Sequence, residues 1–451
     1  MRKVWIAHEP AAGGLCTRML QDLIDRCAAE GGGQVRLTAG LYVTGSIYLK
    51  TGVELYLDAG AVLRGSPDRH DYSHVCTLPT MVEGVPQWYN AILAAEDARD
   101  VSITGEGLID GADCPDPDGE QGFRGPHAVF FHHCENVHVS GITLVRAACY
   151  HLMFESCRRI RVRHVSIYGG QDGFRFGDCE DAEVRDCDVR SGDDCIGGSG
   201  NRDIRILDTS LNTPGGAVLQ MSCHHLHVKH CVFWGPGLYP AVFREDKRYS
   251  LNYAAVCAGF DYGYARGEDS DDWLFEDVTF ENAELLFRWE ENMYDRVNIP
   301  LHHVVFDRCR ALNLVFPCLI DAAEGSPIDL TFRDCEFTCA HEDARCEGLF
   351  LRGKNFRRLE MDRVVLRGYQ DRPFDLTGAG TVELRGVRIE HPLTADCLPP
   401  ESAQTIRVTS EDAPTRLGRE AAPGTTSLYL PVDADEAFRG ALPWIPGSLQ
   451  N

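Results

Sequence analysis

The sequence predicts an all-β protein, a parallel β-helix in which short strands wind into successive coils, with a helix that covers its N-terminal end. The first observation is an internal repeat, because segments of about 20 to 25 residues resemble one another along much of the chain. The second is the content of each segment, which reads as two or three short runs of alternating, β-branched-rich residues separated by turns. A repeat of this length built only from strands is typical of a solenoid.

Cysteines mark the register of the repeat. Cys134, Cys157 and Cys179 recur at intervals of 23 and 22 residues, and Cys223 follows two coils later. Successive coils of a β-helix lie about 4.8 Å apart, so equivalent positions stack and small apolar side chains form interior ladders. The chain has 19 cysteines but no spacing typical of a zinc site. We therefore expect reduced thiols that act as small core residues.

The expected elements follow the chain in order. Residues 1–33 form an N-terminal segment whose helix, over 17–33, has Thr17 as a possible N-cap and glycines at its end. This helix caps the open end of the solenoid with an apolar face that comprises Leu20, Leu23, Ile24, Cys27 and Ala28. The β-helix is expected over 34–393. The pattern then fades into a tail or C-terminal cap over 394–451, in which TSLYLPVDADEAF is one candidate strand.

Composition and charge exclude several classes of function. The chain has 451 residues, 44% of them hydrophobic, and a formal net charge of −24, which disfavours nucleic acid and anionic membrane surfaces as partners. It contains no apolar run long enough for a transmembrane helix. The apolar stretch at the N-terminus is too short for a signal peptide, so we expect a cytoplasmic protein, or else a secreted chain that has lost its leader.

Three aspartates stand out in the stretch 171-QDGFRFGDCEDAEVRDCDVRSGDDCIGG-198. Asp172 lies one coil before the adjacent pair Asp193 and Asp194, so a β-helix would bring all three together. Clustered carboxylates repel one another, and this raises the pKa of at least one of them. Glycoside hydrolysis needs such a protonated carboxyl for the leaving oxygen and an ionised one to activate water. The alternatives are a solvated turn between coils or a calcium site.

The chain resembles the polygalacturonase family of glycoside hydrolases, family 28, from about residue 15 to about residue 300. The resemblance is carried by QDLIDRCAAEGGGQVRLTAGLYVTGSIYLKTGVELYLDAGAVLRGSPDRHDY, by ITGEGLIDG, and by DG followed one coil later by SGDDCI. It implies a right-handed parallel β-helix that hydrolyses glycosidic bonds, usually in pectin, with inversion at the anomeric carbon. It also implies that Asp193 is the general acid and that Asp172 and Asp194 polarise the water. We expect no cofactor and no metal.

The chain departs from the family pattern at two places. Where the family has Gly-His-Gly near the acid, this chain has 213-TPGGAVLQ-220, with Gly215 in place of the histidine. Where the family has Arg-Ile-Lys to hold the substrate carboxylate, this chain has 240-PAVFREDKRYS-250. Arg244 or Lys247 could bind the substrate, or could form a structural ion-pair cluster with the acidic residues between them. These departures put the preference for uronate in doubt more than hydrolysis itself.

Four aromatic or imidazole side chains are further candidates for substrate contact. The stretch LLFRWEENMYDR is similar to the family segment that ends in a sugar-stacking tyrosine, here Tyr294, and Trp289 could form an apolar platform for a pyranose ring. Tyr150 and His151 lie one coil before Asp172 and could line the cleft. For Tyr294 and Trp289, the alternative is packing in the core or at an edge.

The sequence therefore predicts an inverting glycoside hydrolase whose partner is a pectin-type, galacturonate-containing oligo- or polysaccharide, with cleavage from a chain end. Three alternatives remain. The first is a hydrolase of the same fold for a neutral or modified sugar. The second is a uronate polysaccharide lyase, which would commonly use calcium and a basic residue. The third is a carbohydrate-binding β-helix without catalysis, which would bind glycans without turnover.

Overall fold

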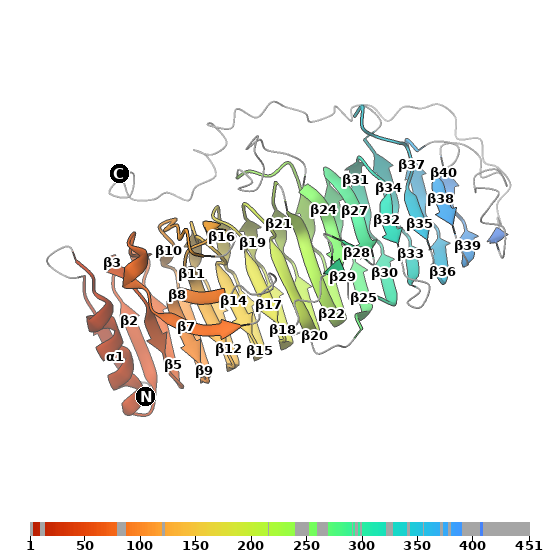
Figure 1. The fold of residues 1–451 in the computed structure, drawn as a ribbon. Coiled ribbons are helices and arrows are strands. Elements are labelled where there is room, and N and C mark those ends of the chain that lie inside the picture. Colours follow the sequence, from red (N-terminus) through yellow and green to blue (C-terminus); the bar gives the residue numbers. More distant parts are fainter. Residues whose placement is uncertain are drawn as a thin grey trace.

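Alternating apolar side chains make most of the chain β-strand, and the strands wind into an elongated parallel β-helix (Figure 1). The computed structural model describes residues 3–9, 14–78, 87–119, 122–214, 216–239, 252–258, 269–290, 292–293, 296–297, 300–321, 328–340, 343–354, 356–369, 373–377, 380–389 and 406–408. The predicted candidate strand TSLYLPVDADEAF lies outside these residues.

Three faces make up the solenoid, and strands from successive coils pair in parallel on each of them. One face is a 13-stranded sheet of β3 (Gly40–Thr44), β6 (Ala61–Gly65), β10 (Leu108–Asp110), β13 (Thr143–Val145), β16 (Ser166–Tyr168), β19 (Asp188–Arg190), β21 (Ser210–Asn212), β23 (Val232–Trp234), β26 (Thr279–Glu281), β31 (Arg310–Leu314), β34 (Glu336–Cys339), β37 (Val365–Arg367) and β40 (Arg388–Ile389).

The other two faces belong to a 26-stranded sheet and are called here the first and second faces. The first face contains β4 (Ile47–Leu49), β8 (Gln87–Glu96), β11 (His127–His132), β14 (Leu152–Glu155), β17 (Phe174–Gly177), β20 (Ile196–Leu207), β22 (Ala217–Lys229), β24 (Asn252–Ala258), β27 (Ala283–Glu290), β32 (Cys318–Asp321), β35 (Leu351–Lys354) and β38 (Phe374–Thr377). The long strands β20 and β22 continue onto the second face.

The second face contains β1 (Val4–Ala7), β2 (Gly33–Leu37), β5 (Val53–Leu57), β9 (Arg99–Gly105), β12 (Glu135–Ser140), β15 (Arg158–Arg163), β18 (Glu180–Arg185), β25 (Asp271–Glu276), β30 (His303–Asp307), β33 (Asp329–Arg333), β36 (Arg358–Asp362), β39 (Thr381–Arg385) and β41 (Ile406–Val408). β7 (His74–Leu78) pairs antiparallel with β8, and β28 (Asn292–Met293) pairs with β29 (Arg296–Val297). A short 3₁₀ turn covers Arg69–Asp71.

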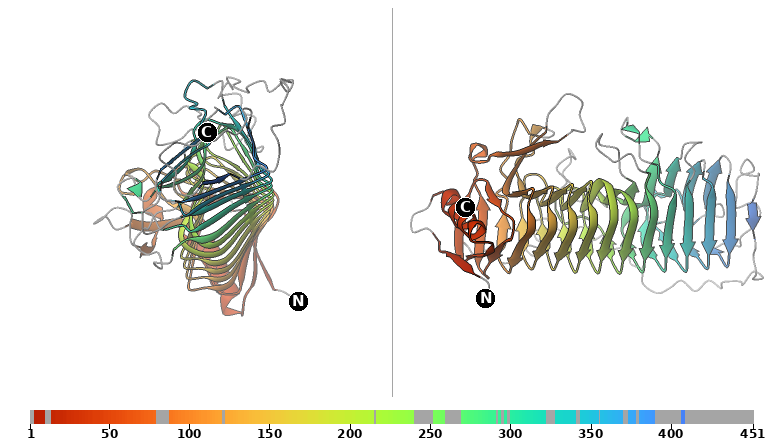
Figure 2. Two further views of the ribbon diagram at one scale, coloured as in Figure 1. Left: turned by 90° about the vertical axis from the view of Figure 1, so that its right-hand side faces the viewer. Right: turned by 90° about the horizontal axis from the view of Figure 1, so that it is seen from below.

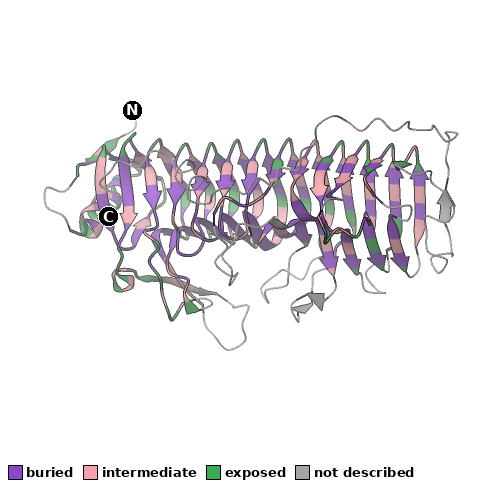
Figure 3. Ribbon diagram, turned by 90° about the horizontal axis from the view of Figure 1, so that it is seen from above, coloured by how far each residue is buried: buried purple, intermediate pink, exposed green. Residues whose placement is uncertain are grey.

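The interior of the coils is a continuous apolar core, in which buried residues alternate with exposed ones along the strands (Figure 3). Phe131, Phe154 and Phe176 occupy equivalent positions of three successive coils and stack almost parallel, with ring centroids 5.3 and 5.2 Å apart. This separation follows from the spacing of the strands that carry the rings. The stacking of identical positions predicted from the repeat is therefore present.

The predicted cysteine ladder lies inside the coils. The Cys134 N–H donates to Sγ of Cys157 on the next coil, and all four predicted members are buried. Asn201 takes the position between Cys179 and Cys223, one coil from each, where its Oδ1 accepts the N–H of Cys179 at 3.0 Å. Every cysteine in the described residues is a free thiol, as predicted.

Two of the three corners of a coil are tight, whereas the third is longer. Between the first and second faces, single residues such as His133, Ser156 and Asp178 turn the chain with φ of 51, 52 and 49°. The third corner joins the 13-stranded sheet to the first face and contains five or more residues in several coils, as in 146–151 and 169–173. This corner therefore has room for side chains that do not belong to the core.

The N-terminal end is closed by helix α1 (Thr17–Ala29), which lies against the first coil (Figure 2). Leu20, Ile24 and Cys27 are buried as predicted. The predicted N-cap is wrong: Cys16 is the N-cap residue, and the Thr17 hydroxyl instead accepts the Gly45 N–H at 2.9 Å. The helix end is therefore tied to the first coil rather than to itself.

Two features of the ends were not predicted from the sequence. β1 precedes α1 in the chain and pairs in parallel with β2. It therefore extends the second face ahead of residue 34, where the β-helix was expected to start. β41 pairs with β39 and lies beyond residue 393, the expected end of the solenoid. Among the described residues, no helix is long and apolar enough to cross a membrane.

Candidate active site

The three predicted aspartates lie together at the third corner of two adjacent coils. Asp172 is in the turn between β16 and β17, and Asp193 and Asp194 are in the turn between β19 and β20. Backbone pairing fixes these turns on each other, because the N–H of Gly173 donates to the carbonyl of Asp194 at 2.9 Å. One carboxylate oxygen from each aspartate lies within 4.8 Å of the others. The repeat spacing therefore brings the three aspartates together, as predicted.

A buried arginine binds two of the three carboxylates. Nη1 of Arg124 donates to Oδ2 of Asp172, and Nη2 donates to Oδ2 of Asp193 at 2.6 Å. The Arg124 side chain is only 3% exposed, and its guanidinium lies over the ring of Tyr150, 5.6 Å from the centroid. A guanidinium between two carboxylates supplies strong charge-assisted hydrogen bonds and compensates their repulsion.

Arg124 was not predicted from the sequence. It lies in the turn between β10 and β11, two coils before Asp172, and this turn has 16 residues where the equivalent turns of the next two coils have six and five. Long loops often carry functional residues. The length of this turn is the one feature of the sequence that could have drawn attention to Arg124. Nothing in the spacing shows that its arginine turns toward the aspartates.

Burial and mutual repulsion raise the pKa values of the adjacent aspartates. Burial is the main cause of the rise in the pKa of Asp193 to about 7; the nearby Asp172 adds to it, and Arg124 opposes it. Burial also raises the pKa of Asp194 well above its usual range, with repulsion from Asp193 and Asp172 as further causes. A carboxyl with a pKa near or above neutrality can act as a general acid at physiological pH.

Glycine at position 216 allows the next coil to approach the cluster. A side chain there would collide with the carboxylates of both Asp194 and Asp193. The neighbouring Ala217 N–H donates to Oδ1 of Asp194 at 2.8 Å. The predicted departure from the family pattern, Gly215, lies outside the described residues.

Gly197 lies on the first face beside the cluster, and its neighbours leave room for a methyl group in ordinary contact. Arg175, Gly197 and Gln220 are paired across β17, β20 and β22. A methyl group added at Gly197 would meet only ordinary contacts, 3.7 Å from the Gln220 carbonyl, 3.8 Å from Oδ2 of Asp194 and 4.0 Å from Nη1 of Arg175. Gly197 therefore lies between the carboxyl of Asp194 and the guanidinium of Arg175.

Tyr150 and His151 are both close to the cluster, but their environments differ. Tyr150 lies under the guanidinium groups of Arg124 and Arg175 and stacks on the ring of His127. His151 is fully buried, with Nδ1 2.7 Å from the carbonyl oxygen of Asp172 and Nε2 accepting the Ala147 N–H. Burial lowers the pKa of His151 to about 4, so it stays neutral. Its place is therefore inside the turn, where it holds the Asp172 backbone instead of contacting substrate as predicted.

Trp289 points into the core of the coils. It is 1% exposed and belongs to the same buried apolar cluster as the stacked phenylalanines. Strand alternation explains this, because Arg288 takes the outward position of β27 and Trp289 the inward one. The alternative of core packing is thus what the structure shows. The candidates Arg244, Lys247 and Tyr294 lie outside the described residues.

The carboxylates have the chemistry and spacing to bind a divalent cation. In this structure, however, Arg124 occupies Oδ2 of both Asp172 and Asp193 and supplies the compensating positive charge. A divalent cation would have to share these carboxylates with that buried guanidinium. The arrangement therefore favours acid–base chemistry over metal binding.

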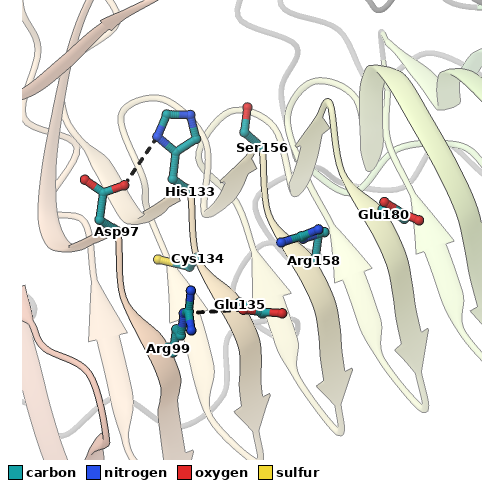
Figure 4. Close-up of a pocket in the computed structure, with 8 residues that line it drawn as sticks. All are labelled: Asp97, Arg99, His133, Cys134, Glu135, Ser156, Arg158 and Glu180. Carbon is teal, nitrogen blue, oxygen red and sulfur yellow. Dashed lines mark ion pairs between the residues drawn. The ribbon is translucent and has the colours of Figure 1, made fainter.

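A separate hollow of about 560 Å³ lies at the corner between the first and second faces (Figure 4). It is lined by Asp97, Arg99, His133, Cys134, Glu135, Ser156, Arg158 and Glu180. Several of these side chains pair with each other, for example Arg99 with Glu135 at 3.4 Å. This hollow lies at a different corner from the aspartates. Its charged side chains pair with each other at the solvent-exposed edge of the coils.

The fold and the cluster together define a parallel β-helix protein with three carboxylates gathered at one corner of adjacent coils. A sequence profile described as Glycosyl hydrolases family 28 matches residues 82–217. A probable polygalacturonase from Vitis vinifera is 26% identical over 198 residues, an alignment that covers 40% of this chain and 40% of that protein. The matched region includes all three aspartates and Arg124.

Solved structures extend the similarity to most of the chain at the level of the fold. The family 28 exopolygalacturonase from Yersinia enterocolitica has a TM-score of 0.64 and 15% identity, covering 86% of this chain and 78% of its own. A hyperthermoactive exopolygalacturonase from Thermotoga maritima has a TM-score of 0.56 and 15% identity, covering 83% and 88%. The predicted right-handed parallel β-helix is confirmed. Over residues 82–217 the chain is similar to glycosyl hydrolase family 28, in agreement with the resemblance to polygalacturonases that the sequence predicts.

Proposed function

We propose that this protein hydrolyses glycosidic bonds in a galacturonate-containing oligosaccharide, with inversion at the anomeric carbon. The observation that supports the proposal most directly is the cluster of Asp172, Asp193 and Asp194, in which burial and repulsion raise the pKa of Asp193 to about 7 and that of Asp194 well above its usual range. One protonated carboxyl can protonate the leaving oxygen while an ionised one takes a proton from water. The resemblance assigns the acid role to Asp193.

The stereochemical outcome is part of the proposal and needs its own measurement. Inverting glycosidases commonly hold their two carboxyl groups about 6.5–9.5 Å apart and retaining enzymes about 5–5.5 Å apart. Here oxygen atoms of all three carboxylates lie within 4.8 Å of each other. By that rule alone the cluster is closer to a retaining pair, whereas the resemblance to polygalacturonases supports inversion.

An anionic substrate is supported by the cations beside the cluster. The guanidinium groups of Arg124 and Arg175 both lie over the ring of Tyr150 beside the cluster, and this local positive charge favours an anionic sugar. The protein as a whole has a net charge of −24, so attraction must be local. Cleavage from the ends of oligosaccharides is a further part of the proposal, and it is supported by two proteins of similar fold that are named exopolygalacturonases. A cytoplasmic location is also part of the proposal.

The test is to incubate the protein with oligogalacturonides of defined length and with a panel of aryl glycosides, and to follow the product anomers by NMR. We expect a shortened oligogalacturonide whose new reducing end first appears in the inverted configuration. Asp172→Asn should lower kcat by about 10²- to 10⁴-fold, because the site loses a carboxylate that activates water. Asp188→Asn, a change in the same region but outside the cluster, is the matched control.

The outcomes separate the alternatives. Cleavage of a neutral glycoside but not of oligogalacturonides would keep the hydrolase and change the substrate. An unsaturated, ultraviolet-absorbing product would identify a lyase. Binding of glycans without turnover on the whole panel would refute hydrolysis.

A further inference from the structure

Resting on the hydrolysis proposed above, we propose that Tyr150 is a positioning residue of this site, whose ring holds the guanidinium of Arg124 between Asp172 and Asp193. The sequence predicts Tyr150 as a residue that contacts the substrate. In the role proposed here, Tyr150 acts through Arg124 instead, and its ring contacts a cation of the protein itself.

The side chain of Arg124 has to cross a whole coil before it meets the carboxylates. Arg124 lies three residues before His127, where β11 begins, whereas Tyr150 and Asp172 lie in the equivalent turns of the next two coils and Asp193 lies one coil further on. Successive coils are about 4.8 Å apart. Because Tyr150 belongs to the coil in between, its ring is the surface over which the guanidinium reaches the aspartates.

The ring of Tyr150 is itself held in place. The Tyr150 N–H donates to Nδ1 of His127 at 3.2 Å, and its carbonyl accepts the N–H of Ala128 at 3.0 Å, so the backbone is bound to the preceding coil. The His127 ring stacks on the Tyr150 ring, with centroids 5.3 Å apart and planes inclined by 16°. Burial, with the charges of the two nearby arginines, lowers the pKa of His127 to about 3, so this imidazole is neutral. The aromatic platform is therefore rigid and carries no charge of its own.

Tyr150 also allows two cations to lie close together. The guanidinium carbons of Arg124 and Arg175 are each 5.6 Å from the centroid of its ring. Both arginines are buried, so solvent screens their mutual repulsion only weakly. The negative face of an aromatic ring attracts a cation more strongly where water is excluded. The ring thus offsets the repulsion and keeps Arg124 beside the aspartates while Arg175 lies nearby.

The turn that carries Arg124 fixes its backbone rather than its guanidinium. A side chain at Gly125 would collide with the carbonyl of Cys114, and one at Gly119 would collide with the carbonyl of Arg124, so the turn is packed closely against itself. The arginine side chain that leaves this turn has many rotamers, and holding it in one of them costs conformational entropy. The contact with the Tyr150 ring restricts those rotamers before the carboxylates bind.

The position of Arg124 affects the acid. Burial is the main cause of the rise in the pKa of Asp193 to about 7, the charge of Asp172 adds to it, and Arg124 opposes it. Asp194 is the remaining carboxyl beside Asp193. A guanidinium that left this position would therefore raise the pKa of Asp193 further, and Asp172 would lose a partner that now donates to its Oδ2.

The first test locates the guanidinium directly and does not need activity. In a crystal structure of the Tyr150→Leu variant, Nη1 or Nη2 of Arg124 should no longer contact Asp172 or Asp193, whereas Tyr150→Phe should keep both contacts. A Tyr150→Leu structure that retains both contacts in place would overturn the proposal. Because this result can be obtained even if no substrate is cleaved, its failure is distinct from a failure of the proposed hydrolysis.

The second test separates the attraction of the ring from its shape. Pentafluorophenylalanine at position 150 keeps the size of phenylalanine but removes the negative face that attracts a cation. The protein with this residue should resemble Tyr150→Leu in the contacts of Arg124, although its packing is close to that of Tyr150→Phe. It also serves if Tyr150→Leu does not fold. Contacts identical to those of Tyr150→Phe would contradict the cation–π interaction on which the proposal depends.

The third test measures the consequence for the reaction on an oligogalacturonide. Tyr150→Leu should lower kcat by about 10- to 100-fold with a smaller change in KM, because the charged groups of the site are misplaced. It should also move the basic limb of the kcat/KM profile to higher pH, because Asp193 loses the cation that opposes its rise in pKa. Tyr150→Phe should restore both properties.

Phe130→Leu is the matched control, because Phe130 belongs to the same buried apolar cluster as Tyr150. It should lower the free energy of unfolding without moving the pH profile. Circular dichroism checks that each variant folds. A folded Tyr150→Leu variant that loses stability but keeps the wild-type pH profile, as in the control, would assign Tyr150 to packing alone and refute the positioning role.

Discussion

Glu155 is a buried carboxyl outside the aspartate cluster, on the first face one coil before Arg175. It is 2% exposed, and its Oε2 accepts no hydrogen bond within the described part of the chain. Burial, the largest cause, raises its pKa to about 7, with Asp178 adding to the rise and Arg175 opposing it. The glycine of the next coil, Gly177, leaves the room that this side chain fills. The protein therefore holds an acid that ionises near neutral pH and stabilises the fold only while it is protonated.

This predicts a pH-dependent stability. A folded-state pKa above the unfolded value contributes stability that is complete below the unfolded pKa, about 4.3, and is lost as pH rises through about 7. Glu155→Gln should therefore raise the free energy of unfolding at pH 8, relative to the wild type, by on the order of 2–3 kcal/mol, with a much smaller difference at pH 5. Urea unfolding at both pH values measures this. Equal differences at the two pH values would contradict it.

At the scale of the element, helix α1 shows how an amphipathic segment closes the solenoid. Its buried side chains cover the first coil, while Arg18 on the opposite side is 96% exposed. Without such a cover the end of the coil would expose apolar side chains. Only the buried face of the helix covers the first coil. Substitutions on that face should therefore lower the free energy of unfolding more than substitutions on the exposed face.

Ile24→Ala should lower the free energy of unfolding by about 2–4 kcal/mol, because it leaves a cavity between the helix and the first coil. Arg18→Ala on the same helix is the matched control and should change it by less than about 0.5 kcal/mol. Chemical denaturation followed by circular dichroism measures both. A loss in Ile24→Ala no larger than in the control would mean that the helix does not contribute to the cooperative unit.

At the scale of the whole molecule, the β-helix is a stack in which each coil contacts its neighbours above and below. β15 and β18 have parallel partners on both sides, as do the strands of the site coils, whereas the stack ends at α1 and, in the described residues, at β41. Stability in such a stack is approximately the sum of coils and interfaces between neighbours. The aspartate cluster thus lies where the stack is supported from both directions.

Hydrogen exchange should reflect this position. Backbone amides of β15 and β18 should exchange at least about tenfold more slowly than those of β39, because opening a central coil breaks two interfaces and a terminal opening breaks fewer. Mass spectrometry of peptides after exchange at constant pH measures the rates. Uniform protection along the whole stack would show instead that the solenoid opens as one cooperative unit.

Much of the site could be read from the sequence because it follows the repeat. The period places Asp172 directly before Asp193 and Asp194 in the stack, and it places the cysteines inside, since equivalent positions of successive coils must coincide. Trp289 shows the limit of motif similarity, because the alternation of its own strand puts it in the core. The predicted N-cap at Thr17 was wrong because the Thr17 hydroxyl accepts the N–H of Gly45 in the first coil instead of capping the helix.

The sequence by itself determined the solenoid, its capping helix, the reduced thiols and the meeting of three carboxylates, because each of these follows from periodicity along the chain. Only the tertiary structure decided that Arg124 binds two of them, from 48 and 69 residues away, and that His151 lies beneath the turn. The reason is physical: an irregular insertion has no period, so the direction of its side chains is set by the surface onto which it folds.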